Sequence, residues 1–318
     1  MEAADVTAGL VVMAYGTPSS PRQVEAYYTH IRRGRPPSAA QLAELEARYA
    51  AIGGVSPLAR RTQAQVRAIA AALAADDPGG WRVALGNKHA APFVEDAVTD
   101  LARGDGPAGA VDRLVGLVLA PHFSRGSVGE YHERAATAAT AHGLPYTGVR
   151  SWWELPAWVE AQAARVRAAR AALPARTTVL FTAHSLPERV LADDPYVDEL
   201  AASAAAVAAS AGLGAEVAPG EAVPGGWSLA WQSAGRTPEA WRGPDVLDVI
   251  RALGTGTDAE GVLVCPQGFA SDHLEVLHDL DVDARRVARE AGLAFARTAS
   301  VNDEPAVMAA LAGVVRRS

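Results

Sequence analysis

The stretch 177–188, TTVLFTAHSLPE, passes from the apolar run Val179 to Phe181, flanked by threonines, into a polar turn that begins with His184. A short run rich in β-branched and aromatic residues, without regular polar alternation, is typical of a strand buried on both faces of a parallel sheet. Ser185 and Glu188 have the spacing of a capping box, which predicts a helix directly after the strand. We therefore expect a strand, a turn and a helix, with the imidazole of His184 held at the turn.

Similar runs recur along the whole chain. Strands are predicted at residues 9–14, 81–86, 113–120, 177–183, 228–231 and 261–265. Alanine-rich segments with helical periodicity separate most of them, and one helix is expected to begin at Ser38, which forms a capping-box pattern with Gln41, and to stop at Gly53. Strands that alternate with helices predict an α/β fold, in which helices cover a parallel sheet.

The length of 318 residues is about twice that of a usual single domain. We expect two lobes, residues 1–150 and residues 151–303, with the last helix, residues 304–318, packing back on the first lobe. Ligands of parallel sheets bind outside the carboxyl ends of the strands. Three predicted strands end in polar residues, at His122, at His184 and at 265–268. A crevice that gathers these strand ends is the predicted site.

The composition excludes several classes of function and compartment. Lys and Arg number 29 against 36 Asp and Glu, a net charge of −7, which argues against a nucleic-acid partner. Cys265 is the only cysteine, so the chain cannot build an internal disulfide or an iron–sulfur cluster held by several cysteines. Apolar stretches such as 114–120 are shorter than the roughly 20 residues that cross a bilayer. We expect a cytoplasmic protein without integral membrane contact.

One segment combines several possible metal ligands. Glu275, Asp279 and Asp283 recur at intervals of four and would share one face of a helix, where like charges repel. Such a helix either points its acidic face at water or holds a cation, and both interpretations stay open on spacing alone. His273 and His278 lie close by, and imidazole combined with carboxylate suits iron, zinc or cobalt better than magnesium. For His184 two interpretations also stay open: a hydrogen-bonded structural histidine, or a functional one that takes a proton or binds a metal.

Eight blocks of sequence, spread in order over most of the chain, resemble the ferrochelatase family. They are MAYGTP (13–18), YYTHIRRGR (27–35), RYAAIGGVSPLA (48–59), KHAAPFVEDAV (88–98), LAPHFS (119–124), AHSLPE (183–188), WQSAGRTPEAWRGPDV (231–246) and GFASDHLEVLHDLD (268–281). The chain is most similar to the soluble bacterial branch, of Gram-positive type, that inserts iron into coproporphyrin III. Neither the four cysteines nor the apolar lip and extension of other branches is evident.

The resemblance implies two Rossmann-like lobes that enclose a porphyrin cleft. It implies that His184 and Glu275 are the catalytic pair at the Fe2+ site, and that Tyr15 approaches the iron from the opposite face of the ring. Asp279 and Asp283 fall on an outer site for Mg2+ or another divalent ion. Six further residues match positions that contact the porphyrin or line its cleft: Arg32, Arg48, Tyr49, Ser56, Tyr131 and His89.

The implied reaction belongs to haem biosynthesis. A metal chelatase, classed as a lyase, inserts Fe2+ into coproporphyrin III and releases two protons, with His184 as the proton acceptor assisted by Glu275. Arginine suits the propionates because its planar fork bonds a carboxylate through two N–H groups. The alternatives are protoporphyrin IX as substrate, cobalt insertion into a reduced tetrapyrrole, and a non-catalytic haem or metal carrier. The expected partners are the porphyrin and a downstream coproheme-processing enzyme, with the chain itself a monomer.

Overall fold

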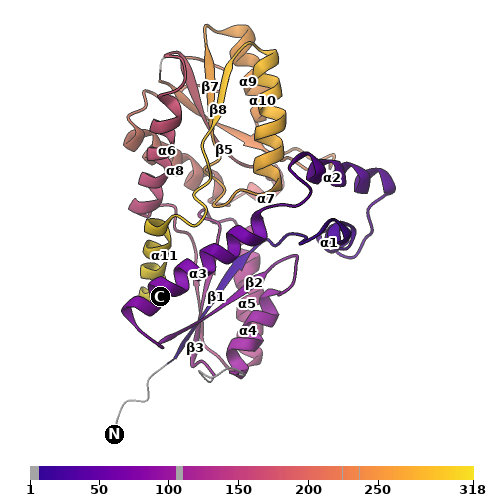
Figure 1. Cartoon of the computed structure of the whole chain (residues 1–318), viewed down its shortest axis with the longest axis vertical. Coiled ribbons are helices and arrows are strands. Elements are labelled where there is room, and N and C mark those ends of the chain that lie inside the picture. Colours follow the sequence, from indigo (N-terminus) through magenta and orange to yellow (C-terminus); the bar gives the residue numbers. More distant parts are fainter. Residues whose placement is uncertain (1–6, 105–109, 224, 236) are drawn as a thin grey trace. The chain divides into compact units, whose positions relative to one another are not determined.

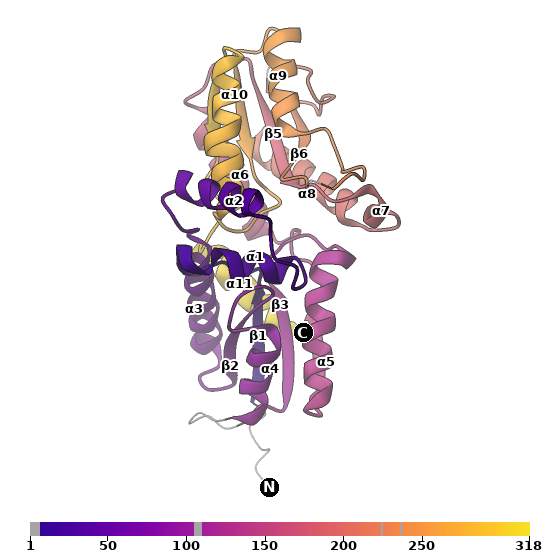
Figure 2. The same cartoon turned by 90° about the vertical axis from the view of Figure 1, so that its right-hand side faces the viewer.

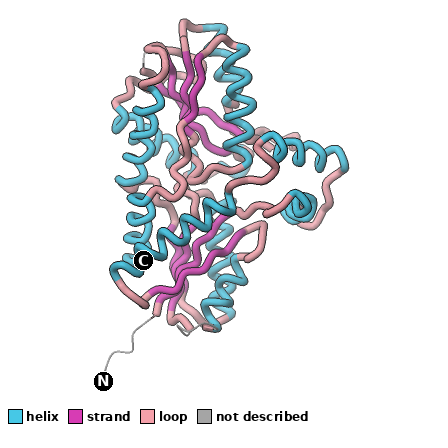
Figure 3. The backbone as a smooth tube through the Cα atoms, in the orientation of Figure 1, coloured by secondary structure: helices cyan, strands magenta, loops and turns pink. Residues whose placement is uncertain are grey.

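The computed structural model describes residues 7–104, 110–223, 225–235 and 237–318. The chain divides into an N-terminal unit, Met1–Trp152 with Asn302–Ser318, and a C-terminal unit, Trp153–Val301. Each unit is built on its own sheet of four parallel strands (Figure 3). The predicted α/β class, with a small parallel sheet in each half of the chain, is therefore confirmed.

The N-terminal unit has the strand order β2-β1-β3-β4. Its strands are β1 (Ala8–Ala14), β2 (Trp81–Asn87), β3 (Arg113–Val118) and β4 (Tyr146–Val149). Its helices are the 3-10 helix η1 (Pro21–Gln23), α1 (Val24–Ile31), α2 (Ala39–Ala51), α3 (Leu58–Asp76), α4 (Val94–Arg103), the π-helix η2 (Arg125–Gly129), α5 (Glu130–Ala141) and α11 (Pro305–Arg317).

Helices cover this sheet, and β1 is buried along its whole length. Val11 and Met13 pack in one core cluster with apolar residues of α4 and α5. Neighbouring residues of a strand point to opposite faces, and the C-terminal helix α11 packs on α3, which lies away from α4 in Figures 1 and 2. The last helix thus belongs with the first half of the chain. A strand covered on both faces has no polar side, which explains its continuous apolar run.

The C-terminal unit has the strand order β6-β5-β7-β8. Its strands are β5 (Thr177–His184), β6 (Trp227–Gln232), β7 (Gly261–Cys265) and β8 (Ala294–Arg297). Its helices are α6 (Pro156–Arg170), α7 (Glu188–Leu191), α8 (Tyr196–Ala211), α9 (Val246–Gly256), the π-helix η3 (Val276–Ala284) and α10 (Arg285–Glu290), which continues η3.

The burial of β5 shows how this sheet is packed. Val179 and Phe181 lie in a cluster with residues of α6 and α8, together with the buried Cys265. Leu180, between them, lies in a second cluster with residues of α9, η3 and α10. Both faces of the strand are therefore buried. His184 is its last residue and is only partly buried.

The strand order fixes where ligands can bind. In each sheet the order reverses between the first strand and the third, and parallel sheets bind ligands outside the carboxyl ends of the strands at such a point. Tyr15 directly follows β1, and His184 ends β5. Both residues therefore lie at the switch point of their own sheet.

Two local predictions fail. The helix expected directly after His184 is wrong: the Ser185 hydroxyl donates to the carbonyl of Arg242 at 2.7 Å, and α7 begins only at Glu188 and lasts four residues. The strands β4 and β8 were not predicted, because each is a short edge strand with partly exposed side chains and no continuous apolar run. Within the described ranges, no helix is both long and apolar enough to cross a membrane.

Candidate functional site

His184 and Glu275 come together at the end of β5. The Nε2 atom of His184 lies 3.7 Å from Oε2 of Glu275, and about a third of each side chain is exposed, 32% and 35%. His184 Nδ1 is hydrogen bonded to the carbonyl of Ser185. Because a carbonyl only accepts, Nδ1 carries the hydrogen and neutral His184 has its lone pair on Nε2, facing Glu275. This imidazole can take a proton or bind a metal ion there.

A second imidazole flanks Glu275. His273 Nε2 lies 3.5 Å from the same Oε2 atom, and His273 Nδ1 donates to the carbonyl of Ser271 at 3.0 Å. Burial alone would lower the pKa of His273, but the hydrogen bond and the charge of Glu275 outweigh it, so the pKa is raised above its ordinary value. His273 thus balances part of the Glu275 charge. The sequence placed this histidine near the acidic segment but gave no sign of its contact with Glu275.

The backbone around Glu275 is tied to the neighbouring strands. Gln232, the buried last residue of β6, donates to the carbonyl of Glu275 at 3.5 Å and accepts from the Thr182 hydroxyl at 2.9 Å. Thr182 lies two residues before His184 in β5. These contacts hold the start of the helix against the strand that carries His184.

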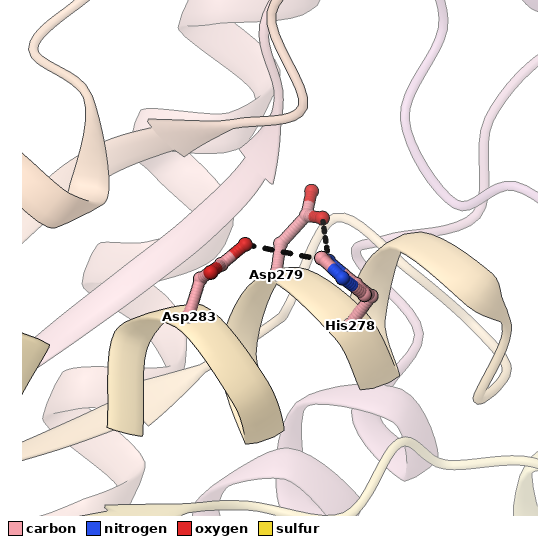
Figure 4. A group of neighbouring side chains, drawn as sticks. All are labelled: His278, Asp279 and Asp283. Atoms are coloured by element: carbon pink, nitrogen blue, oxygen red, sulfur yellow. Dashed lines mark ion pairs between the residues drawn. The ribbon is translucent and has the colours of Figure 1, made fainter. Parts of the chain in front are cut away.

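The two aspartates lie together one turn further on, and His278 is close to both of them (Figure 4). His278 Nδ1 is 3.6 Å from Oδ1 of Asp279 and 3.3 Å from Oδ2 of Asp283. The three residues each offer one ligand atom, and these atoms lie within 4.8 Å of one another. The segment is the π-helix η3 rather than the α-helix that the spacing of four assumed. The described contacts thus pair Glu275 with His184 and His273, and the two aspartates with His278.

Arg297 braces this helix from β8. Its guanidinium donates to both carboxylate oxygens of Asp281 at 2.9 Å and to Asp272 at 3.1 Å. The Arg297 side chain is only 12% exposed. Asp272 precedes the helix and Asp281 lies inside it, so one cation fixes both ends of the segment that carries Glu275 and Asp279. Sequence reasoning missed Arg297, because its strand was not predicted.

In the N-terminal unit, Tyr15 and His89 are in contact. Their ring centroids lie 4.6 Å apart, and the Tyr15 side chain is 46% exposed. His89 Nδ1 lies 3.1 Å from Nδ1 of His30, so one of the two must donate to the other. Burial, followed by the charges of Lys88 and other nearby cations, lowers the pKa of His89 to about 4. His89 is therefore neutral near pH 7, where it supports the Tyr15 ring without adding charge.

Tyr131 lies buried beside the one lysine of the chain. Lys88 Nζ pairs with Glu130 at 2.7 Å and sits 5.2 Å from the centre of the Tyr131 ring. Burial, with the nearby Tyr15 and Glu130, raises the pKa of Tyr131 well above its ordinary value. Its hydroxyl therefore stays protonated, able to donate a hydrogen bond.

The remaining predicted porphyrin contacts lie on α1, on α2 and at the start of α3. Arg32 follows α1, where its Nε donates to the carbonyl of Arg35 at 3.2 Å. Arg48 and the buried Tyr49 are in the last turn of α2. The buried Ser56 accepts a hydrogen bond through Oγ from the backbone N–H of Leu58 at 3.2 Å.

A pocket of about 420 Å3 opens in the same unit. His89 and His30 line it, together with Tyr27 and Phe93. Tyr27 donates through its hydroxyl to the carbonyl of Gly16 at 3.0 Å, which fixes the loop after β1. The volume lies within the usual range of small-molecule sites, about 300–1,000 Å3.

The chain is similar to known proteins over nearly its whole length. The ferrochelatase family model matches residues 7–318. The coproporphyrin III ferrochelatase of Geobacillus kaustophilus is 42% identical, covering 97% of this chain and 95% of that protein, and that of Bacillus subtilis is 40% identical, covering 96% of each. The coproporphyrin III ferrochelatase of Anoxybacillus flavithermus is 43% identical, covering 96% and 95%.

Among solved structures, that of CbiX, the terminal enzyme for sirohaem biosynthesis in denitrifying bacteria, is similar with a TM-score of 0.53. It is 16% identical, with 98% of this chain and 99% of CbiX covered, so the likeness concerns the fold alone. The family match and the close relatives extend over nearly the whole length and include the blocks that carry His184 and Glu275. The chain therefore belongs to the ferrochelatase family.

Proposed function

We propose that this chain is a coproporphyrin III ferrochelatase, a lyase of haem biosynthesis that inserts Fe2+ into coproporphyrin III to give coproheme. The observation that carries the proposal is the His184 and Glu275 pair, 3.7 Å apart at the carboxyl end of β5. The chain-wide similarity to coproporphyrin III ferrochelatases gives the substrate. In the reaction two pyrrole N–H bonds break, the ring nitrogens bind Fe2+, and two protons leave.

His184 is the proposed acceptor of those protons. Its Nε2 has the lone pair, because Nδ1 donates to a carbonyl, and Glu275 stands ready to stabilise the imidazolium that forms. His273 shares Glu275 through the same oxygen atom. Glu275 can therefore either help bind Fe2+ beside His184 or receive a proton through His273.

The proposed porphyrin contacts belong to the N-terminal unit. Tyr15 is 46% exposed, and we assign it to the porphyrin face opposite His184. Arg32 and Arg48 supply cations for propionates, and coproporphyrin carries four of these groups. We assign the remaining contacts to Tyr49, Ser56, Tyr131 and His89.

Further parts of the proposal concern ions and partners. Asp279 and Asp283 form the proposed outer site for a divalent ion, beside the iron site. Catalysis is proposed to need no iron–sulfur cluster, because Cys265 is the one cysteine of the chain. We propose a monomer in the cytoplasm, which passes coproheme to a downstream enzyme.

The experiment that tests the function is anaerobic Fe2+ insertion into coproporphyrin III and protoporphyrin IX, measured side by side. The expected result is a strong preference for coproporphyrin III, with insertion lost in His184→Ala and in Glu275→Gln. Porphyrin binding, followed by fluorescence quenching, should survive in Glu275→Gln. Preference for protoporphyrin IX would overturn the proposed substrate, and haem binding without insertion would overturn the enzymatic proposal.

A further inference from the structure

We infer that His278 is the third ligand of the outer site, and that its imidazole makes this site select Fe2+, Co2+ or Zn2+ over Mg2+. The metal site itself is argued from the residues of η3. Any part of this ion in metal insertion rests on the proposed function. The three side chains point toward one another from a single helix (Figure 4).

The π-helix is what brings His278 to the aspartates. His278 and Asp283 are five residues apart, and in an α-helix five residues turn the chain by about 500°, which leaves the two side chains about 140° apart. A π-helix bonds residue i to residue i+5, so residues at that interval stack one turn apart. The helix from Val276 to Ala284 is of this kind, and His278 Nδ1 lies 3.3 Å from Asp283.

The distances suit neighbouring ligands of one ion. Bonds from a transition metal to imidazole nitrogen or carboxylate oxygen are about 2.0–2.2 Å long, so adjacent ligand atoms lie about 3.0–3.4 Å apart at tetrahedral or octahedral angles. His278 Nδ1 is 3.3 Å from Asp283 and 3.6 Å from Asp279. The first distance falls inside this range and the second lies just above it, while the ligand atoms of all three residues lie within 4.8 Å of one another.

Neighbouring residues already orient each carboxylate. Asp279 accepts a hydrogen bond from the Ser233 hydroxyl on Oδ2 at 2.5 Å, which leaves Oδ1 toward His278. Asp283 pairs through Oδ1 with Arg286 at 3.6 Å, which leaves Oδ2 toward His278. Such outer contacts are what fixes the ligands of established metal sites. Ser233 adopts a φ of 60°, a left-handed conformation that a serine rarely adopts, and such strain concentrates at functional sites.

The His278 imidazole has a ring nitrogen available to bind a metal ion. His278 Nδ1 is buried from solvent and has no hydrogen-bond partner with acceptable geometry among the described residues. Two carboxylates alone offer the hard oxygen ligands that Mg2+ accepts. An imidazole nitrogen adds strength for Zn2+, Co2+ and iron but little for Mg2+, which prefers oxygen. The nitrogen is therefore the part of the site that sets its preference.

The test is a Co2+ titration followed by visible absorption, with Mg2+ binding measured by calorimetry. Both are measured in the His184→Ala/Glu275→Gln background, so that the iron site does not contribute. We expect one Co2+ bound per chain, and at least about a tenfold loss of Co2+ affinity in His278→Phe. Mg2+ affinity should change by less than about twofold, because Mg2+ does not depend on nitrogen. His142→Gln, which removes an exposed histidine of the N-terminal unit, is the matched control and should bind Co2+ unchanged.

Asp283→Asn is the second variant, in case His278→Phe does not fold. It removes a charged ligand, so it should weaken both ions while keeping the imidazole. Equal Co2+ affinity with and without His278 would overturn the inference, as would tighter binding of Mg2+ than of Co2+. A chain that binds Co2+ as expected but inserts no metal into porphyrin refutes the proposed function and leaves the metal site standing.

Discussion

Replacing Arg297 with methionine should destabilise the C-terminal unit by removing the buried cation that Asp272 and Asp281 share. Arg297 makes two 2.9 Å hydrogen bonds to Asp281 and one of 3.1 Å to Asp272. Removing one partner of a buried ion pair costs about 3–5 kcal/mol. The Asp281 side chain is 30% exposed and recovers some hydration, and Arg285 remains 3.9 Å from it, so the lower end of that range, about 3 kcal/mol, is expected.

Urea unfolding followed by tryptophan fluorescence measures this loss. With a dependence of about 2 kcal/mol per molar urea, the midpoint should fall by about 1.5 M. Metal insertion should fall too, because Asp272 and Asp281 bracket the segment that carries Glu275. Activity is measured under conditions in which urea unfolding shows the variant to be folded, so that a loss of activity is not caused by unfolding.

A charge-balanced variant separates the explanation from simple loss of packing. Arg297→Met/Asp272→Asn/Asp281→Asn has no uncompensated buried charge, so it should recover much of the stability that Arg297→Met loses. A triple variant that is no more stable than Arg297→Met would refute the argument, because the cost would then come from the lost arginine stem and not from the stranded carboxylates.

Three further predictions follow from burial and close contact. His89, whose pKa drops from 6.5 to about 4, excludes a proton that the unfolded chain binds. His89 alone should therefore account for about 2 kcal/mol of the stability lost between about pH 8 and pH 5, the difference between the parent and His89→Gln in urea unfolding. An equal loss in the parent and in His89→Gln contradicts this. Burial raises the pKa of Cys265 to about 12, so a thiol reagent should modify it only after unfolding, and rapid native labelling would disprove this. A Cβ on Gly268 would lie 2.8 Å from the Ala183 backbone, so Gly268→Ala should cost about 1–3 kcal/mol in thermal unfolding, unlike Gly256→Ala, which has open space; equal melting of both would count against it.

The sequence predicted those parts of the fold that depend on local chemistry. The capping box of Ser38 and Gln41 is present, with both reciprocal hydrogen bonds. The buried strands β1 and β5 were readable because both of their faces are covered, which leaves β1 with a continuous apolar run and β5 with apolar and threonine residues up to Ala183. Ser185 shows the limit of such patterns: its hydroxyl bonds the distant carbonyl of Arg242, a tertiary contact that spacing along the chain does not reveal.

The candidate site was predictable in kind but not in geometry. His184 was a candidate because it follows a predicted buried strand. Glu275 was a candidate because it belongs to the acidic series with Asp279 and Asp283. The partners of Glu275 and Asp279 depend on how the helix is wound. A spacing of four suggested an α-helix, in which His278 would turn away from Asp283, and only the i to i+5 bonding of η3 brings them together.

The repeated strand order has a consequence for the descent of the two halves. Each sheet places its strands in the order second, first, third, fourth, and the first residues of the central pairs are Ala8 with Arg113 and Thr177 with Gly261. The seventh residue after Ala8 is Tyr15, and the seventh after Thr177 is His184. The two residues thus occupy equivalent positions of a pseudo-repeat, the pattern expected when a half-length gene is duplicated and one ancestral position diverges into a phenol in one copy and an imidazole in the other.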